Sequence, residues 1–470
     1  MKTHDERLSV FLKASWGVGA LGTTSMLYLI NLFLVYFLVR YVGIPPAIAG
    51  TLLAITRVYD AVIDPSIGMM SDRTESRWGR RRPWLFAGAV LCPLAVLAVF
   101  NPPGFLSGQA LYGFVLAAML FYCTAYSLFS IPFMALGVEM SDHYSERASV
   151  MAYRTFFVYA SGVVIASGAP ALVAMLGSDR AAYSTMSIAA ACVVCAAMMW
   201  VVVFTGGARV TKRSTEKVDF GAWVRTAVSN TPYLIVLFTK MSLYLGTAFL
   251  GAVSLFFMTY VLEKDEGVFA VYGLASNLMS IATVPLWSRL LHHFERRTLF
   301  FVLLVGNALG HLSWLLASPA EPMSLFLARA VFVGSLGGGS VLVSLAMLSD
   351  TIEYDRLRTG LRREGTFIGG FELMNTTSFV VGPLVVGFAL SAAGLVPGQV
   401  DLGAQPESAL AMIEFAYAVV PALMGVIGIV LTYFYRLDAR RLAEMRAAQP
   451  QPQAAPRQRA QGSQLPAAGL

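Results

Sequence analysis

Twelve apolar segments, each about long enough to cross a bilayer, divide this chain from end to end. A transmembrane helix needs about 20 mostly apolar residues, and a helix satisfies all its backbone polar groups within lipid. Hydrophobic residues make up 57% of the 470 and charged residues 13%, a balance that excludes an ordinary soluble domain. The sequence predicts an all-α membrane protein with twelve transmembrane helices, at about residues 15–42, 47–68, 83–101, 109–139, 149–176, 182–206, 232–262, 268–290, 299–317, 323–349, 366–394 and 410–435.

The basic residues predict the orientation of these helices. The loops on one side of the membrane hold 27 of the 34 lysine and arginine residues, together with both termini, and the other side holds only Arg180 and Lys264. Because cytoplasmic loops carry the basic excess, we expect both termini in the cytoplasm and the protein in the inner (plasma) membrane. The net charge of +7 is spread over short loops, so no nucleic-acid partner is expected.

A polar segment divides the spans into two sets of six, the arrangement typical of secondary transporters. The predicted units are an N-terminal half at 1–206, a cytoplasmic linker at 207–231, a C-terminal half at 232–435 and a tail at 436–470. The tail is rich in Ala, Pro and Gln, so it is expected to be disordered. We expect a monomer embedded in the lipid bilayer.

Two aspartates, Asp60 and Asp64, lie four residues apart inside the second apolar segment and therefore share one helix face. At about 1.5 Å per residue, Asp60 lies roughly 12 Å from the segment end at Gly68. An acidic residue near mid-membrane is by default a site for an ion or a proton. The alternative is a structural pair neutralised by Arg57, although one arginine neutralises only one of the two charges.

The run from Asp60 to Trp84, DAVIDPSIGMMSDRTESRWGRRRPW, resembles the signature of the glycoside-pentoside-hexuronide:cation symporters, the melibiose-permease-like branch of the major facilitator superfamily. Four other stretches agree: SWGVGALG at 15–22, SIPFMAL at 130–136, SERASVMAYRTFF at 145–157 and SDTIEYDRLRTGLRREGTFIGG at 349–370. The resemblance covers about residues 15–435. It implies the major facilitator fold of two six-helix halves, and the import of a small solute together with a coupling cation.

By this resemblance the coupling cation binds at Asp60 and Asp64, and Ser127 on the fourth span completes the site. Sodium requires several oxygen ligands, and sodium-coupled relatives often carry a side-chain amide where this chain has Ile63. A proton, which needs only one titrating carboxylate, is therefore the expected coupling ion, and sodium held by the two aspartates is the alternative. No cofactor and no other metal are expected.

The substrate cavity should be more apolar than that of a disaccharide carrier. Sugar-carrying relatives place acidic residues, an aromatic ring and a lysine at the positions of Ala20, Ser130, Met134 and Thr376. A site that hydrogen-bonds several hydroxyls loses about 1–3 kcal/mol for each buried group left unpaired. These four positions are the candidate substrate contacts that depart from the family pattern.

Two charged residues inside the spans are further candidates for substrate contact. Arg154 follows the family's Tyr-Arg pattern, and it is expected either to hold an anionic or hydroxyl-rich substrate or to pair with an aspartate of the second span. Glu372 in the eleventh span is the other candidate; its alternative is a structural ion pair with Lys240 in the seventh span.

The loop after the second span resembles the gating motif of facilitators. Acidic and basic residues of this motif are expected to form ion pairs that hold the cytoplasmic face closed when the protein opens outward. The alternative is that the basic residues are plain positive-inside charge. The candidate gating residues are Asp72, Arg77, Arg80, Arg81, Glu139 and Asp142 in the first half and, in the second half, Arg363 together with Asp350, Glu353, Asp355, Arg362 and Glu364.

The expected function is cation-driven import of a glycoside- or uronide-like solute by alternating access. The first alternative is an amphipathic or lipid-like cargo, and the second is a membrane receptor or scaffold that transports nothing. An enzyme is not expected, because the sequence holds no G-x-S-x-G, H-E-x-x-H or P-loop motif. The four cysteines all fall in apolar segments, so neither a disulfide nor a metal site is expected.

Overall fold

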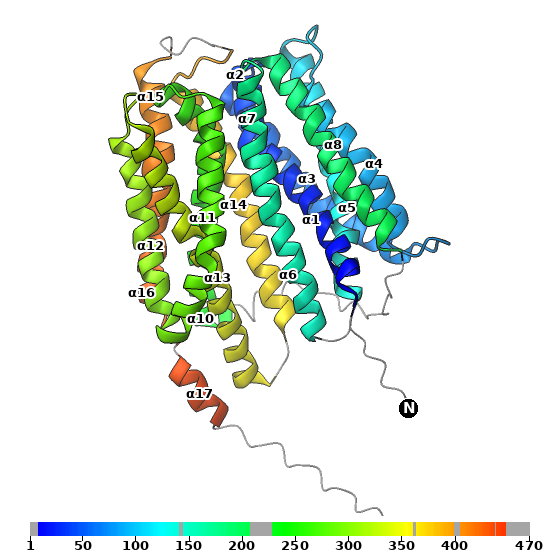
Figure 1. Cartoon of the computed structure of the whole chain (residues 1–470), viewed down its shortest axis with the longest axis vertical. Coiled ribbons are helices and arrows are strands. Elements are labelled where there is room, and N and C mark those ends of the chain that lie inside the picture. Colours follow the sequence, from blue (N-terminus) through cyan, green and yellow to red (C-terminus); the bar gives the residue numbers. More distant parts are fainter. Residues whose placement is uncertain are drawn as a thin grey trace, which may run out of the picture.

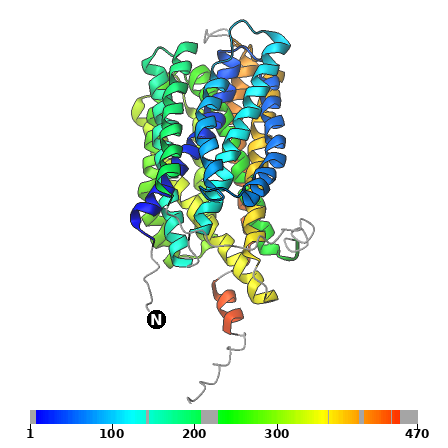
Figure 2. The same ribbon diagram turned by 90° about the vertical axis from the view of Figure 1, so that its right-hand side faces the viewer.

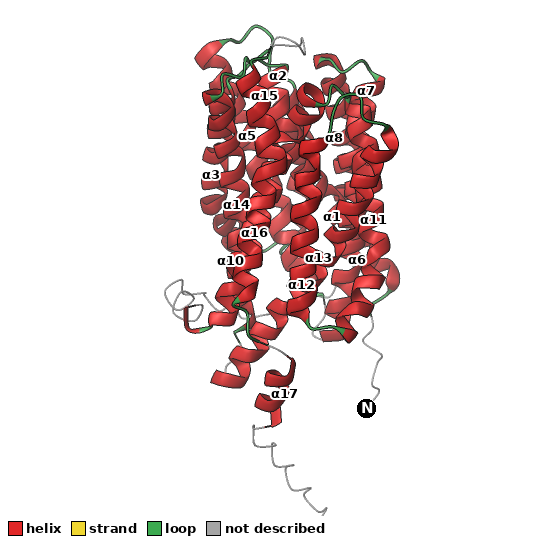
Figure 3. Cartoon of the chain, turned by 90° about the vertical axis from the view of Figure 1, so that its left-hand side faces the viewer, coloured by secondary structure: helices red, strands yellow, loops and turns green. Residues whose placement is uncertain are grey.

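The computed structural model describes residues 8–140, 144–206, 228–360, 363–398, 405–437 and 439–447. Over these residues the chain consists of helices joined by short loops (Figure 3). Twelve of its helices are long and apolar enough to cross a membrane. The predicted all-α fold with twelve spans is therefore confirmed.

The first six spans run from Val10 to Phe204. They are α1–η1–α2 (Val10–Tyr28, Leu29–Leu34, Val35–Arg40), α3 (Pro46–Arg73), α4 (Arg82–Phe100), α5 (Gly108–Glu139), α6–η2–α7 (Tyr144–Ser161, Gly162–Ser167, Gly168–Met175) and α8 (Arg180–Phe204). The segments η1 and η2 are single π-helical stretches, which widen the helix locally and often occur near functional sites.

The last six spans run from Thr231 to Tyr433. They are α10–η3 (Thr231–Phe256, Phe257–Val261), α11 (Glu266–His293), α12–η4 (Arg296–Leu312, Ser313–Leu316), α13 (Met323–Thr359), α14 (Glu364–Ala392) and α15–η6–α16 (Glu407–Glu414, Phe415–Val419, Val420–Tyr433). The short helix α17 (Ala439–Ala447) follows, within the tail that we expected to be disordered.

One helix is longer than its hydropathy indicates. The apolar segment ends near residue 349, yet α13 continues to Thr359 through residues that we expected to form a loop. Gly360 then ends the helix with a positive φ of 71°, the left-handed conformation that glycine adopts at helix C-termini. Residues 350–359 are thus held on a rigid helix rather than on a flexible connection.

The bundle has two distinguishable ends. The start of α1 and the helix α17 lie at the same end, which we call the terminal face (Figures 1 and 2); it carries the loops at 74–81 and 294–295. The opposite end, the far face, carries the loops at 41–45, 101–107, 176–179 and 262–265. Within the halves, α1 packs on α6 and α8, and α10 packs on α14 and α16.

The two halves contact each other through α3 against α14 and through α7 and η2 against α11. Glycine permits close approaches at the first of these contacts: a Cβ on Gly50 of α3 would lie 2.8 Å from the carbonyl oxygen of Pro383 on α14. Small residues let membrane helices approach closely.

Hydrogen bonds also join the halves at the far face. The Tyr41 hydroxyl donates to Glu266 Oε1 at 3.2 Å, and the Ser178 hydroxyl donates to Glu266 Oε2 at 2.5 Å. The Gly398 amide donates to the Val39 carbonyl oxygen at 2.9 Å. In this conformation the far face is therefore closed by contacts between the two halves.

Candidate functional site

The two aspartates of α3 face inward, toward α5. Their helix turns its apolar side outward and its acidic side toward the bundle. Val58 and Val62 are strongly exposed on the outer side, where lipid would cover them. The Asp60 side chain retains only 15% of its accessible surface. Asp64 lies one turn further along, and its Oδ1 accepts a hydrogen bond from the hydroxyl of Ser127 on α5, which is buried. The structure thus brings the three predicted cation-binding residues to one place between α3 and α5.

Arg57 contacts Asp60 only weakly. Its Nη1 lies 3.5 Å from Asp60 Oδ2, and its Nη2 lies 3.4 Å from the side-chain oxygen of Asn31 in η1. The other carboxylate oxygen of Asp60, Oδ1, is buried without a hydrogen bond of ordinary geometry, with the Cys123 thiol as a neighbour. One long arginine contact neutralises at most one of the two carboxylates.

A small cavity adjoins Asp60. Its volume is about 20 Å³, which is room for about one water molecule or an ion of similar size. Three spans line it, with Leu27 and Ile30 from the first, Thr56, Arg57 and Asp60 from α3, and Met119, Tyr122, Cys123 and Tyr126 from α5. A space of this size beside a carboxylate suits a proton carrier or a single dehydrated cation, whereas it cannot hold a sugar.

The backbone near Asp64 offers one more oxygen. Pro65 lies inside α3 and has no N–H group, so the carbonyl of Ala61 lacks its helical donor. A carbonyl freed in this way can serve as a ligand for a cation. The described residues therefore offer two carboxylates, one hydroxyl and one backbone oxygen.

Arg154 on α6 is the least satisfied of the predicted substrate contacts. Its Nε is buried without a hydrogen-bond partner, and no ion pair between described residues involves its guanidinium. It interacts electrostatically with Tyr126, which lines the cavity beside Asp60. An arginine left free inside a membrane span is available to an anionic or hydroxyl-rich ligand.

The other predicted substrate positions are scattered. Ala20 is completely buried in helix packing and Ser130 is nearly so, whereas Met134 is 37% exposed. Glu372 and Thr376 are exposed on α14. In this conformation, Ala20 and Ser130 thus present almost no surface to a ligand.

Lys240 and Glu372 do not form the ion pair that we considered. No contact of 4 Å or less joins their charged groups among the described residues. Lys240 is only 6% exposed, and its ammonium lies 4.6 Å from the centre of the Tyr244 ring. Glu372 accepts a hydrogen bond from Asn375 Nδ2 at 3.2 Å. A buried lysine near a carboxylate, without direct contact, is a second charged feature inside the spans.

The gating candidates of the first half form one cluster at the terminal face. Arg80 Nη2 and Arg81 Nη2 both lie 2.8 Å from Glu139 Oε1. Arg81 also pairs with Asp72, and its Nη1 donates to the Ser71 hydroxyl at 2.7 Å. The cluster links the end of α3, the start of α4 and the end of α5, all within the first half. Sequence reasoning missed Ser71, because a serine beside a charged loop carries no distinctive signal.

The remaining gating candidates behave differently. Arg77 is exposed at the terminal face, and Asp142 lies outside the described residues. In the second half, Asp350 pairs with Arg296 of α12, a partner that the sequence did not indicate, while Arg363 interacts electrostatically with Asp355. Among the described residues, the first half therefore carries an ion-pair cluster at the terminal face, whereas the second half carries the pair of Asp350 and Arg296.

The sequence analysis missed two residues of this site. Asn31 and Cys123 lie beside Arg57 or Asp60 in space but far from them in the chain. Of the two, Asn31 carries a recognisable signal, since a side-chain amide within an apolar span is uncommon.

Comparisons with known proteins identify the family and the fold of the chain. The family profile described as MFS/sugar transport protein matches residues 15–439. A putative glycoside/cation symporter of Escherichia coli is 27% identical, with 93% of this chain and 95% of that protein covered. The isoprimeverose transporter of Lactiplantibacillus pentosus is also 27% identical, with coverages of 87% and 85%. The crystal structure of a D-xylose-proton symporter shares the fold at 14% identity, with a TM-score of 0.61 and coverages of 91% and 98%.

Proposed function

Because the chain belongs to the MFS/sugar transport protein family, we propose that it is a symporter that imports a glycoside- or uronide-like solute together with a proton. The observation that carries this proposal is the pair of partly buried carboxylates, Asp60 and Asp64, with a cavity for one small ion beside Asp60. A receptor or scaffold would not need two acidic residues at this depth. The names of the relatives, a glycoside/cation symporter and an isoprimeverose transporter, support the same class of cargo.

Alternating access gives the two ends of the bundle their roles. We assign the terminal face to the cytoplasm, because the basic residues concentrate on that side. The contacts of Tyr41 and Ser178 with Glu266 close the far face, so this conformation corresponds to a carrier that is shut toward the outside. Breaking these contacts would open the far face while the terminal face closes. The carrier acts in the inner membrane as a monomer.

We assign the coupling ion as a proton rather than sodium. The carboxylates have few oxygen neighbours: the Ser127 hydroxyl and the free Ala61 carbonyl, with Ile63 between the two aspartates. Sodium at such a site would lack ligands that hard cations require once dehydrated. A proton needs one carboxylate oxygen, and Asp60 Oδ1 is buried without an ordinary hydrogen bond.

Uptake by proteoliposomes should therefore follow the proton gradient. One pH unit, acidic outside, carries about 1.4 kcal/mol for each proton and should drive about tenfold accumulation. An inward sodium gradient at constant pH should leave the initial rate unchanged. Stimulation by sodium with no response to the pH gradient would overturn the proton assignment while leaving the symporter intact.

Arg154 is the proposed contact for the polar part of the cargo. Since Met134 offers no hydrogen-bonding group and Ala20 is buried in helix packing, one charged donor favours a solute with an apolar face and one anionic group. A charge-assisted hydrogen bond contributes about 1.5–3 kcal/mol. A uronide satisfies this description better than a neutral disaccharide does.

The Arg154→Gln variant should raise the KM for a glucuronide by about 10- to 100-fold, because about 1.4 kcal/mol corresponds to a factor of ten. The Arg154→Lys variant keeps the charge but loses the planar guanidinium group, so its KM should lie between those of the wild type and of Arg154→Gln. Radiolabelled uptake measures both. High-affinity melibiose transport that is insensitive to Arg154→Gln would contradict this role.

The alternative cargo is an amphipathic or lipid-like solute, which the apolar positions Ala20 and Met134 also favour. Competition separates the two cargo classes. Simple glycosides should inhibit uptake by a glycoside carrier, whereas only lysolipid-like amphiphiles should inhibit a carrier of the second kind.

A further inference from the structure

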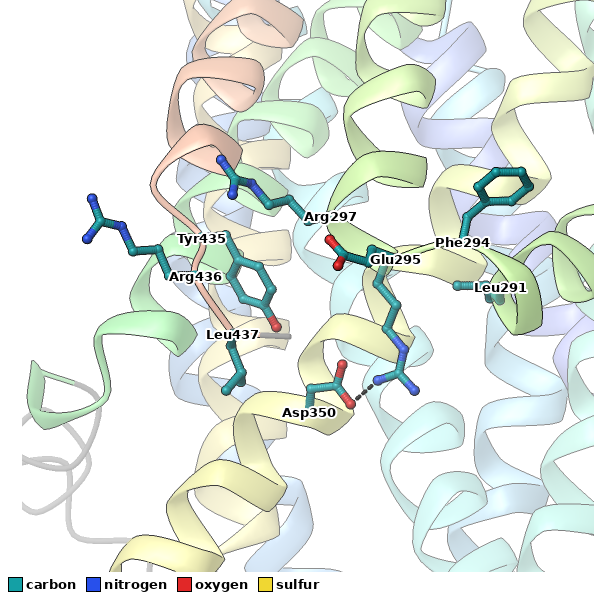
Figure 4. Close-up of a pocket in the computed structure, with 9 residues that line it drawn as sticks. Leu291, Phe294, Glu295, Arg297, Asp350, Tyr435, Arg436 and Leu437 are labelled. Carbon is teal, nitrogen blue, oxygen red and sulfur yellow. Dashed lines mark ion pairs between the residues drawn. The ribbon is translucent and has the colours of Figure 1, made fainter. Parts of the chain in front are cut away.

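A separate pocket lies at the terminal face of the second half, far along the chain from the aspartates of α3. Its volume is about 260 Å³, and it lies between the end of α16 and the start of α12, with Asp350 of α13 at its lower side (Figure 4). The resemblance to symporters concerns only Asp350 here, as a gating candidate, and neither it nor the transport proposal gives the pocket a ligand. Its chemistry is a mixture of arginines, two carboxylates and one buried hydroxyl.

The pocket keeps a net positive charge. Arg296, Arg297 and Arg436 line it together with Glu295 and Asp350. Arg296 pairs with Asp350, as the dashed line in Figure 4 shows. No ion pair between described residues involves Arg297 or Arg436, so the charges of these two guanidinium groups are not neutralised by a carboxylate.

Arg297 is held in place without being neutralised. Its Nη2 donates to the Tyr433 carbonyl oxygen at 2.6 Å, and its guanidinium lies 5.6 Å from the centre of the Tyr433 ring. These contacts fix its position against α16 and use only one of its five donors. A fixed guanidinium with free donors is suited to a phosphate oxygen.

Tyr435 provides the independent sign of a ligand. Its side chain is 1% exposed, and its hydroxyl is buried without a hydrogen-bond partner among the described residues. The residue lines the pocket, and Figure 4 shows the hydroxyl directed away from the α16 backbone toward the side of Asp350. Burial raises the pKa of this hydroxyl despite the nearby Arg296, so it remains a donor. An unpaired buried donor is costly, and an acceptor oxygen in the pocket would satisfy it.

The start of α12 adds further donors. Arg296 is the first residue of this 17-residue helix, and the N-cap residue Glu295 makes no capping hydrogen bond through its side chain. The first backbone N–H groups of a helix lack intrahelical partners and favour anions. The arginines, the Tyr435 hydroxyl and these amides all point to one kind of ligand, a tetrahedral oxyanion.

The surroundings indicate where such an oxyanion would come from. Phe294, Tyr433 and Phe434 border the pocket region at the ends of their helices and are all more than half exposed. Aromatic side chains at span ends mark the level of the lipid headgroups, and basic pockets between spans bind anionic headgroups. We propose that this pocket binds a phosphate group, supplied by an anionic phospholipid of the surrounding leaflet.

The test uses the purified full chain and counts retained lipid by native mass spectrometry. Protein is released from micelles containing phosphatidylglycerol or, in a parallel sample, phosphatidylcholine of the same acyl chains. Wild-type protein should retain phosphatidylglycerol with an affinity at least several-fold above that for phosphatidylcholine. Retention of both lipids with the same measurable affinity would overturn the proposal.

Two variants locate the binding. Arg436→Gln removes an exposed charge that has no ion-pair partner among the described residues, and Tyr435→Phe removes only the hydroxyl. Combined, they should lower the affinity for phosphatidylglycerol about tenfold, because a charge-assisted contact and a hydrogen bond to the phosphate are lost together. The matched control is Arg289→Gln, which removes an exposed arginine of α11 outside the pocket and should change nothing. The same loss in the control and in the double variant would show a general charge effect and refute the site.

Inorganic phosphate distinguishes the two sources of the ligand. Displacement of phosphatidylglycerol by phosphate at millimolar concentration would assign recognition to the phosphate group itself. Phosphate binding without any lipid retention, lost in the double variant, would keep the site and assign it to free phosphate. Neither outcome depends on transport activity, so the proposal stands or falls separately from the symporter function.

Discussion

Replacing Asp60 or Asp64 with Asn should reduce substrate accumulation, driven by an inward proton gradient of one pH unit, from about tenfold to about onefold. One pH unit carries about 1.4 kcal/mol for each proton, which corresponds to a factor of ten. Either change removes a carboxylate that must bind the coupling ion. The measurement is the ratio of internal to external solute in energised vesicles at steady state.

The control for this prediction is Glu407→Gln, which removes an exposed carboxylate at the start of α15 and should leave accumulation unchanged. Ser127→Ala should lie in between, because it removes one hydrogen bond to Asp64 but neither charge. Protein yield should be similar for all variants. Full accumulation by both aspartate variants would show that the two carboxylates are structural. The proposed cation site at Asp60 and Asp64 would then be wrong.

The number and order of the spans could be predicted because each span must bury its own backbone in lipid. That requirement acts segment by segment, so hydropathy located all twelve helices. The family that the run at 60–84 indicated was also confirmed. That signal is local too, because its charged residues all lie within one short segment.

Side-chain partners across helices could not be predicted in the same way. The contact of Arg57 with Asn31 and the pairing of Asp350 with Arg296 depend on how distant helices pack. Local spacing holds no information on such pairs, whereas it does place Asp60 and Asp64 on one face. The Lys240–Glu372 pair shows the converse error, since two opposite charges in neighbouring spans need not meet.

The extension of α13 has a related cause. Residues 350–359 are polar and were read as a loop, because hydropathy marks where lipid ends rather than where a helix ends. The helix continues into water until Gly360 terminates it. Asp350 thereby gains a rigid position opposite Arg296, which a flexible loop would not provide.

Replacing Glu139 with Gln should be among the most destabilising single changes at the terminal face. Glu139 and Arg81 retain only 8% and 7% of their side-chain surface, and Glu139 Oε1 is shared by Arg80 and Arg81. Removing one partner of a buried ion pair leaves an uncompensated charge and costs about 3–5 kcal/mol. Thermal unfolding in detergent, monitored through the loss of soluble monomer, should show a clear fall in Tm.

Two further variants test whether the loss of stability comes from the ion pair of Glu139 and Arg81. Arg77→Gln should change the free energy of unfolding by less than about 0.5 kcal/mol, because this arginine is exposed. Combining Arg81→Gln with Glu139→Gln should cost less than the sum of the two single variants, because either change alone already removes their ion pair. If the double variant were as unstable as the sum of both single variants, Glu139 and Arg81 would not act as a pair. The cluster would then be ordinary positive-inside charge. It would not join α3, α4 and α5, as a gate at this face requires.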